Sequence, residues 1–323
     1  MSLHPVDVFG PASLSNLGPG FDALGLCISG IGDVVRARRT EYPGIRLKHE
    51  PGAVPWEVLE DSAKNTAVIA AQGVLNLLGT DEGVELTLTK GIPLGSGIGG
   101  SAASAVAGAW AVNMLFGRPF AKEALVEAVL EAEDIASGGR HGDNALPALL
   151  GGLILVSSSD AARYRRIELP GPLHIALILP AVQVLTKQAR DMLPDRVSLK
   201  DAAGNASELA FLVDAYRCGD WETVGQCMMR DRLVEPVRAS LVPCYHAVRS
   251  AALEAGAFGC ALTGSGPAMF ALAPSADEAV SIRNAMLAAS ASERVEAEGV
   301  IAEVNDTGVV DMVEHSVRAQ QPA

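Results

Sequence analysis

The stretch from Pro93 to Ser104 reads P-L-G-S-G-I-G-G-S-A-A-S and contains four glycines. Before it, residues 84–89 alternate between apolar and polar side chains, which predicts a strand with one buried and one exposed face. After it, residues 102–116 are mostly small or apolar, which predicts a helix with Ser101 as its N-cap. The stretch is therefore expected to form a glycine-rich loop that joins a strand to a helix.

Such a loop has the physical features of a phosphate cradle. Its glycines bring backbone N–H groups close to a ligand, and the helix that follows directs its positive end to the same place. An ordinary Walker loop has Lys and then Ser or Thr after its last glycine, whereas here Gly100 directly precedes Ser101. A nucleotide site in this loop is thus not a Walker site. The loop alone is also compatible with a turn that serves only packing.

The composition is that of a globular protein with room for two domains. The chain has 323 residues, of which 49% are hydrophobic and 20% are charged. The sequence pattern restarts near Ser157, so we expect an N-terminal domain over residues 1–156 and a C-terminal domain over residues 157–323. The net charge of -13 disfavours a protein that binds nucleic acid or an anionic membrane.

Several segments bear on the compartment. The first nine residues have neither a basic start nor an apolar block, so no signal peptide is expected. Residues 91–117 lack charge, but half of them form the glycine-rich loop, and the remaining helix is too short to cross a bilayer. The five cysteines are scattered and have no C-x-x-C spacing, which predicts reduced thiols in a cytoplasmic protein.

The segment from Pro11 to Asp22, P-A-S-L-S-N-L-G-P-G-F-D, is expected to be a loop that follows a short strand over Val6–Phe9. Asn16 and Asp22 supply it with an amide and a carboxylate, which suit an ammonium or a hydroxyl group. The alternative is a turn in which both side chains bond only to their own backbone.

A helix is predicted over residues 122–136, and Glu133 falls on its apolar side. A carboxylate in that position is costly unless it is paired or binds a cation, although a boundary carboxylate that reaches water is an alternative. The next segment, S-G-G-R-H-G-D-N, gathers His141, Asp143 and Asn144 on a glycine loop. These residues offer a base, a carboxylate and an amide at one place, and a surface turn is again the alternative.

In the second half of the chain, Thr186 and Arg190 are one helical turn apart after a predicted strand over His174–Leu179. Arg190 could bind a carboxylate in bidentate fashion or form an exposed salt bridge. A second glycine-rich turn, within Gly259–Leu272, is expected to form a hairpin or a wall of the site. The other predicted elements are strands at 34–38, 45–49, 152–156 and 299–304 and helices at 65–78 (capped by Asn65), 207–217, 221–233, 245–255 and 276–288, with a break at 235–238 and a frayed end from Ser316.

Taken in order, these motifs resemble those of the GHMP small-molecule kinases over Pro11–Leu272. P-A-S-L-S-N-L-G-P-G-F-D-A-L-G-L is similar to an N-terminal signature of the family, and P-L-G-S-G-I-G-G-S-A-A-S is similar to its phosphate loop, P-x-x-x-G-L-G-S-S-A-A. S-G-x-x-H-x-D-N together with T-K-x-A-R is similar to members that phosphorylate homoserine, and E-P-V-R and T-G-S-G-P-A-M-F-A-L also match. The resemblance implies a two-domain α+β fold, with a ribosomal-protein-like N-terminal domain, a ferredoxin-like C-terminal domain, and ATP and substrate between them.

The resemblance also implies roles for individual residues. It puts the ATP phosphates on Pro93, Leu94, Gly95, Ser96, Gly97, Ile98, Gly99, Gly100, Ser101, Ala102 and Ala103, adenine near Asn65, and Mg²⁺ on Ser101 and Glu133. It puts the amino-acid substrate on Asn16, Asp22, His141, Asp143, Asn144, Thr186, Arg190 and Arg238. The catalytic residues would be Asn16, Ser101, Glu133, His141, Asp143 and Asn144.

Within that pocket, Asp22 is expected to bind the ammonium group, the two arginines the carboxylate, and Asn144 with Asp143 the hydroxyl. The chain departs from the family pattern at Ile98, which replaces a leucine, and at Gly100, which replaces a serine. The second change removes a hydroxyl and leaves the backbone cradle in place.

The implied activity is transfer of the γ-phosphoryl group of MgATP to the hydroxyl of L-homoserine, in threonine biosynthesis, by a cytoplasmic homodimer. The proton of the hydroxyl could pass to Asp143, to His141 or to the phosphate itself. Two alternatives remain at this point: a GHMP kinase that acts on mevalonate, a sugar or shikimate, and a GHMP fold without catalytic activity that serves as a binding module.

Overall fold

The structure is a computed structural model that describes residues 4–52 and 64–312. Its larger sheet has the strand order β11-β1-β2-β4-β3, with β5 paired to β2 and β6 paired to β5. Only the β3–β4 pair is parallel. The bounds are β1 (Val6–Ser15), β2 (Leu24–Thr40), β3 (Ile45–Glu50), β4 (Gly83–Thr89), β5 (Leu153–Ser157), β6 (Asp160–Ile167) and β11 (Val310–Asp311).

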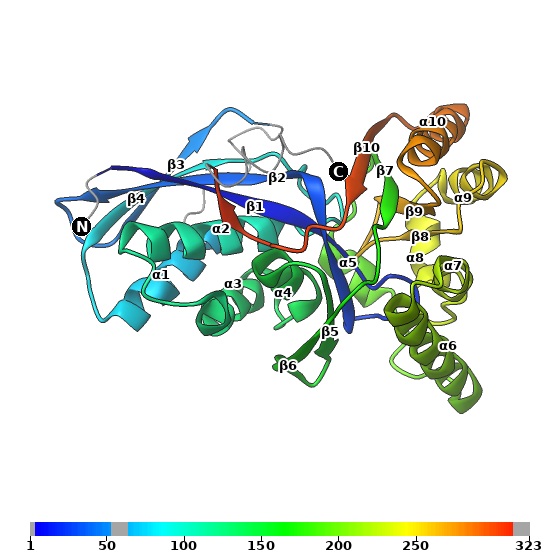
Figure 1. The fold of residues 1–323 in the computed structure, drawn as a ribbon, viewed down its shortest axis with the longest axis horizontal. Helices are drawn as coiled ribbons and strands as arrows, with labels where there is room; N and C mark the ends of the chain where they lie inside the picture. The colour runs from blue at the N-terminus through cyan, green and yellow to red at the C-terminus, as the bar shows by residue number, and fades with distance from the viewer. Residues whose placement is uncertain (1–3, 53–63, 313–323) are drawn as a thin grey trace.

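Four helices cover one face of this sheet, below it in the view of Figure 1. They are α1 (Thr66–Leu78), α2 (Gly100–Leu115), α3 (Val126–Ser137), which continues the short 3₁₀ helix η3 (Lys122–Leu125), and α4 (Gly142–Leu150). The apolar side chains of β4 are buried, as their alternation predicts, but the opposite face is not exposed as expected. Glu85 on that face is buried because Arg38 and Lys48 of the neighbouring strands pair with it, and Thr87 and Thr89 are half-buried. α2 is buried along nearly its whole length, because its small side chains let α1, α3 and β1 approach it closely.

A smaller antiparallel sheet has the order β10-β7-β9-β8. In chain order these strands are β7 (His174–Pro180), β8 (Gly259–Leu262), β9 (Met269–Ala273) and β10 (Ala297–Glu303). Helices α9 (Tyr245–Glu254) and α10 (Ala276–Ser292) pack on this sheet. This is the β-α-β-β-α-β arrangement of a ferredoxin-like domain. Four further helices lie between β7 and α9: α5 (Thr186–Asp191), α6 (Leu199–Cys218), α7 (Trp221–Met228) and α8 (Glu235–Arg238), the last followed by η4 (Ala239–Leu241).

The two sheets share a buried apolar cluster to which Leu14, Leu177, Tyr216 and Phe270 contribute. The expected division of the chain at residue 156 stays a prediction. The β5–β6 hairpin spans this point, and β11 pairs with β1. We therefore propose that the N-terminal unit extends through β6 and includes β11.

The predicted helices and strands are present, with several corrections. β1 runs on to Ser15 into the expected loop, because it keeps pairing with β2 beyond a register shift at Pro11. The helix predicted to end at Leu233 ends at Met228, and residues 235–238 form the short helix α8 instead of a break. α6 begins eight residues earlier than predicted, and β6 and β11 were not predicted. The C-terminal end from Ser316, which was expected to fray, lies outside the described residues.

Two corrections concern the site. Ser101 does not cap α2, because Gly99 adopts a left-handed conformation (φ 70°) and starts the helix one residue ahead of Ser101. His141, Asp143 and Asn144 were expected on a loop, but His141 is the N-cap of α4 and the other two lie in its first turn. Among the helices of residues 4–52 and 64–312, none is long and apolar enough to cross a membrane.

Candidate active site

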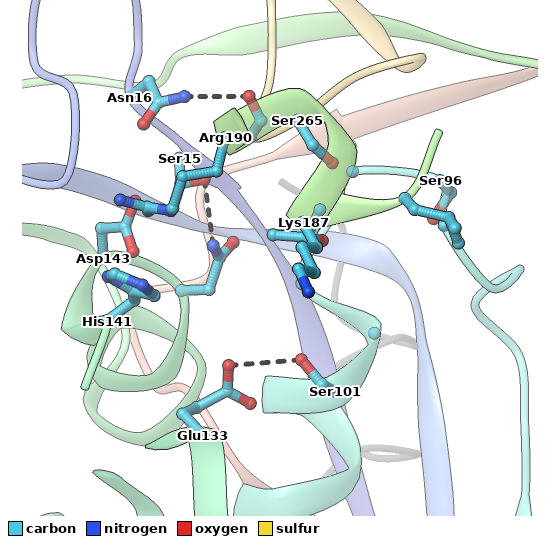
Figure 2. Close-up of a pocket in the computed structure, with 18 of the residues that line it drawn as sticks. Ser15, Asn16, Ser96, Ser101, Glu133, His141, Asp143, Lys187, Arg190 and Ser265 are labelled. Carbon is cyan, nitrogen blue, oxygen red and sulfur yellow. Dashed lines mark hydrogen bonds between the residues drawn. The ribbon is translucent and has the colours of Figure 1, made fainter. Parts of the chain in front are cut away.

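A cavity of about 500 Å³ opens between the two halves of the chain. The larger sheet and its helices contribute the β1–β2 turn, the loop before α2, Glu133 of α3 and the first turn of α4. The C-terminal half contributes α5, Arg238 of α8 and the β8–β9 turn. Figure 2 shows Glu133 and Ser101 at one end of this cavity and Asn16 and Arg190 at the other.

The glycine-rich loop is shaped as a phosphate cradle. Gly95, Gly97 and Gly99 all have positive φ angles. A Cβ atom on Gly97 would lie 2.6 Å from the carbonyl oxygen of Gly266, and one on Gly99 would lie 2.4 Å from Oγ of Ser13. No side chain caps the N-terminus of α2, so its first N–H groups remain available to an anion in the cavity.

Glu133 projects from α3 toward the first turn of α2, as its place in the apolar arc predicts. Its side chain is 5% exposed, and Oγ of Ser101 donates a hydrogen bond of 3.3 Å to Oε2 (Figure 2). Burial raises the pKa of Glu133 to about 7. Hydroxyl and carboxylate oxygens are ligands that Mg²⁺ accepts, and it usually takes few of them from the protein when phosphates supply the rest. Within the part of the chain that the structure describes, no group of three or more His, Cys, Asp or Glu residues could hold a metal ion. The hydroxyl of Ser101 and the buried carboxylate of Glu133 fit a Mg²⁺ ion that is shared with phosphates.

A buried ion pair is bonded to the backbone at both ends of the glycine-rich loop. Lys90 at the end of β4 and Asp33 of β2 are 3% and 0% exposed, and Nζ of Lys90 donates to Asp33, to the carbonyl oxygen of Gly100 (2.8 Å) and to Oγ of Ser104 (3.1 Å). The other oxygen of Asp33 accepts hydrogen bonds from the backbone N–H groups of residues 91 and 92. The pair thereby fixes both ends of the glycine-rich loop.

At the other end of the cavity, two serines of β1 hold the amide of Asn144. Oγ of Ser13 donates to Oδ1 of Asn144, and Nδ2 of Asn144 donates to Oγ of Ser15, both at 3.0 Å. The Asn16 side chain donates to the carbonyl oxygen of Gly264 at 2.9 Å (Figure 2). The orientation of both amides is thus set by the protein.

The β8–β9 turn is bonded to the glycine-rich loop. Oγ1 of Thr263 donates to the carbonyl oxygen of Gly97 (3.2 Å), and the N–H of Ala268 donates to that of Ser96 (3.1 Å). Oγ1 of Thr263 also accepts from the N–H of Ser15 (3.0 Å). The second glycine-rich turn therefore forms the expected hairpin and also lines the cavity through Gly264 and Ser265.

Asp143 and His141 have shifted pKa values. Asp143 is 4% exposed, and its pKa is raised to about 7, mainly by burial and then by the negative charge of Asp22. Burial, and then the charge of Arg190, lowers the pKa of His141. His141 is therefore neutral at neutral pH, with Nδ1 3.9 Å from the Asp22 carboxylate. The site thus holds a carboxyl group that titrates near neutrality beside a neutral imidazole.

Two arginines from the C-terminal half of the chain line the cavity near Asp22, His141 and Asp143. Arg190 forms a bidentate ion pair with Asp22, with N–O distances of 2.9 and 3.1 Å. Arg238 is 3% exposed and donates to the carbonyl oxygens of Ala189 (3.4 Å) and Gly264 (2.7 Å). Burial, and then Arg190, lowers the pKa of Arg238 to about 10, so it still carries its charge at neutral pH. Among the described residues, no carboxylate forms an ion pair with Arg238.

Most residues expected at the site line this cavity. Asn65, Ile98, Ala102 and Ala103 do not: Asn65 caps α1 through a bond from the N–H of Ala67, and the other three are buried in the core. Reasoning from the sequence missed five residues that line the cavity, Ser15, Leu185, Lys187, Gly264 and Ser265. All five lie within or beside the quoted motifs, so their place in the chain was the available signal.

Comparisons with known proteins agree with this geometry. The family model for the N-terminal domain of GHMP kinases matches residues 65–152, and that for the GHMP kinase C-terminal domain matches residues 210–292. A homoserine kinase of Pyrococcus furiosus is 40% identical over 90% of this chain and 95% of its own, and one of Pyrococcus abyssi is 39% identical over 82% and 86%.

Solved structures show the same likeness. The crystal structure of a homoserine kinase from Cytophaga hutchinsonii matches with a TM-score of 0.91 and 36% identity, over 97% of this chain and 99% of that one. A mevalonate kinase of L. major in complex with R-mevalonate matches with a TM-score of 0.72 over 92% of this chain and 94% of that one. Its identity of 20% shows a common fold alone.

Proposed function

The chain belongs to the GHMP kinases, and we propose that it transfers the γ-phosphoryl group of ATP, with Mg²⁺, to the side-chain hydroxyl of L-homoserine. The product is O-phospho-L-homoserine, an intermediate of threonine biosynthesis. The observation that carries the choice of substrate is Arg238, a buried cation without an anionic partner among the described residues. A buried charge of this kind calls for a counter-ion, which the carboxylate of an amino acid supplies.

Asp22 and Arg190 complete the recognition of the amino acid. In the structure their opposite charges satisfy each other. A zwitterionic substrate brings an ammonium group for Asp22 and a carboxylate for the two arginines, so each charge keeps an opposite partner when the substrate binds. Mevalonate and shikimate lack the ammonium group, and sugars lack both charges. The site therefore favours an amino acid over the substrates of other GHMP kinases.

The glycine-rich loop and the N-terminus of α2 bind the ATP phosphates through backbone N–H groups. Ser101 and Glu133 would hold Mg²⁺, which would neutralise charge on the phosphates. Catalysis then rests on placing the hydroxyl in line with the γ-phosphorus and on stabilising the charge that develops on the transferred group. Asn144, fixed by Ser13 and Ser15, positions that hydroxyl.

Asp143 is the proposed acceptor of the hydroxyl proton. Its pKa of about 7 is suited to a general base near neutral pH, and its carboxyl group lines the cavity beside Asn144. Asp143→Asn is expected to lower kcat at least about 100-fold while leaving KM for homoserine within about threefold. A raised KM with unchanged kcat would assign the proton to the phosphate itself and leave Asp143 a binding role.

The substrate is tested by coupled ADP release with MgATP against L-homoserine, L-threonine, L-serine, mevalonate and shikimate. We expect turnover selective for L-homoserine, and Arg238→Gln is expected to raise KM for homoserine far more than KM for ATP. Preference for mevalonate or shikimate would overturn the choice of substrate and leave the family unchanged. ATP binding without turnover of any of these acceptors would favour the non-catalytic binding module.

The proposal includes a homodimer in the cytoplasm. Family likeness supports the dimer, and sedimentation of the purified chain at several concentrations tests it. The five cysteines support a reducing compartment, because all are free thiols and four of them are buried.

A further inference from the structure

Phe21 lies at the corner of the turn that carries Asp22. The carbonyl oxygen of Gly20 accepts hydrogen bonds from the N–H groups of Ala23 and Leu24, both at 2.9 Å, which closes the turn. Asp22 adopts a left-handed conformation (φ 55°) in this turn. Phe21 is half-buried and is not among the residues that line the cavity.

Arg190 and Arg238, the two arginines proposed to bind the substrate carboxylate, both lie over the ring of Phe21. The guanidinium carbon of Arg190 is 5.2 Å from the ring centroid, and that of Arg238 is 5.1 Å from it. Arg190 comes from α5 and Arg238 from α8, while Phe21 comes from the β1–β2 turn. One aromatic ring thus contacts the two cationic groups, which belong to different helices.

Among the described residues, the other contacts of the arginines place their guanidinium groups only indirectly relative to each other. Arg190 is bonded to the side chain of Asp22, and Arg238 is bonded to the backbone carbonyl oxygens of Gly264 and of Ala189, which lies in α5 next to Arg190. Two guanidinium groups so close repel each other, as the effect of Arg190 on the pKa of Arg238 indicates. The face of an aromatic ring attracts a cation and offers a flat surface to a planar guanidinium group.

We propose that Phe21 is a positioning residue for recognition of the substrate carboxylate. Its ring holds the guanidinium groups of Arg190 and Arg238 on one side of the cavity, at a spacing that lets both reach one carboxylate. This inference rests on the proposed function and adds a residue to it. The simpler alternative is that Phe21 only fills space in the turn, in which case an aliphatic side chain of similar size would serve equally well.

The experiment compares the wild-type protein with Phe21→Leu, Phe21→Met and Phe21→Tyr in steady-state kinetics with L-homoserine and ATP. The Leu and Met variants keep an apolar side chain without a ring, and the Tyr variant keeps the ring. Loss of the ring is expected to raise KM for homoserine about tenfold, because two cation–π contacts are lost. In the same variants KM for ATP is expected to stay within about twofold of the wild-type value, since the ring contacts no residue of the glycine-rich loop in the interactions described. Phe21→Tyr keeps the ring, so its KM for homoserine is expected to stay within about threefold of the wild-type value.

Thermal unfolding of the four proteins separates positioning from folding. The proposal stands if the folded Leu or Met variant shows the selective rise in KM for homoserine and the Tyr variant does not. It is overturned if both ringless variants leave that KM within twofold, if they raise both KM values equally, or if the Tyr variant is impaired as strongly as the ringless ones. A wild-type protein that turns over ATP without accepting homoserine would overturn the proposed function and this inference together.

Discussion

The ammonium group of Lys90 and the carboxylate of Asp33 form an ion pair that is withdrawn from solvent under the first turn of α2. Lys90 also holds the carbonyl oxygen of Gly100, and Asp33 also holds two backbone N–H groups before the glycine-rich loop. Removal of one partner from such a pair leaves an uncompensated buried charge.

Lys90→Met is therefore expected to lower the free energy of unfolding by about 3–5 kcal/mol, as measured by urea denaturation. The matched control is Arg36→Met, which removes an ion pair with Asp7 whose side chains are 52% and 34% exposed. That change is expected to cost less than about 1 kcal/mol. Equal losses for the two variants would contradict the account of the buried pair.

The neighbouring glycines of the loop are predicted to respond differently to alanine. A Cβ atom on Gly99 meets Oγ of Ser13 at 2.4 Å and Oδ1 of Asn144 at 2.9 Å, and the φ angle of 70° is unfavourable for alanine. Gly99→Ala is expected to lower kcat/KM about 100-fold by displacing the loop and Asn144 together.

Gly100→Ala is the control for that change. Gly100 has no positive φ angle, and the nearest atom to its Cβ is a methyl group of Ile92 at 3.1 Å. The kcat/KM of the Gly100→Ala variant is expected to stay within about threefold of the wild-type value, since alanine is also a better helix former than glycine. The same reasoning predicts that a glycine at this position, where the phosphate-loop pattern of the family has serine, leaves the cradle intact. Similar losses for both variants, measured by coupled ADP release, would refute this distinction.

Glu133→Gln is predicted to abolish most of the MgATP-dependent activity. The change keeps the size of the side chain and removes the negative charge that Mg²⁺ requires, so kcat/KM is expected to fall on the order of 100-fold. Glu131→Gln, on the exposed side of the same helix, is expected to match the wild type. Titration of the activity with Mg²⁺ checks the reason for the loss, because only Glu133→Gln is expected to require a higher Mg²⁺ concentration.

The stability of the ligand-free protein is predicted to depend on Glu235. Burial raises the pKa of Glu235 from the ordinary 4.5 to about 7, although the Tyr245 hydroxyl donates to its carboxylate at 2.7 Å. An acid with a higher pKa in the folded state binds its proton more tightly there. Its contribution to stability is therefore full below pH 4.5, declines as the pH rises to 7, and levels off above 7.

Glu235→Gln removes this charge and keeps an oxygen acceptor for Tyr245. Its free energy of unfolding is expected to exceed that of the wild type by on the order of 3 kcal/mol at pH 8 and to differ little at pH 4.5. Glu254→Gln, at an exposed position of α9, provides the control and is expected to have no effect at either pH. An effect of Glu235→Gln that is the same at both pH values would argue against titration as its cause.

Local patterns in the sequence were sufficient to predict the strand and the helices around the glycine-rich loop. The apolar positions of β4, the small residues of α2 and the cap at Asn65 are local signals, and each has the predicted counterpart in the structure, although the polar face of β4 is not exposed. The inward direction of Glu133 also followed from helical periodicity. These features depend on neighbours within a few residues, which a single sequence displays.

Features that depend on distant pairing could not be predicted in this way. β1 continues through Pro11 only because β2 lies beside it, and the two residues of β11 form a strand only against β1. The pairing of Lys90 with Asp33 likewise joins residues 57 positions apart. Leu185 and Lys187 line the cavity because α5 lies across from the glycine-rich loop, and no periodicity reports that relation.

The hydrogen bonds from Thr263 and Ala268 to the glycine-rich loop have an evolutionary consequence. The loop that cradles phosphate and the hairpin that supports it come from opposite halves of the gene, so recombination between distant relatives would join surfaces that were never selected together. The glycine-rich loop and the β8–β9 hairpin are therefore expected to be inherited together. New acceptor specificities would arise more readily by substitutions in α5, which carries Arg190, than in α8, whose Arg238 is itself bonded to Gly264 of the hairpin.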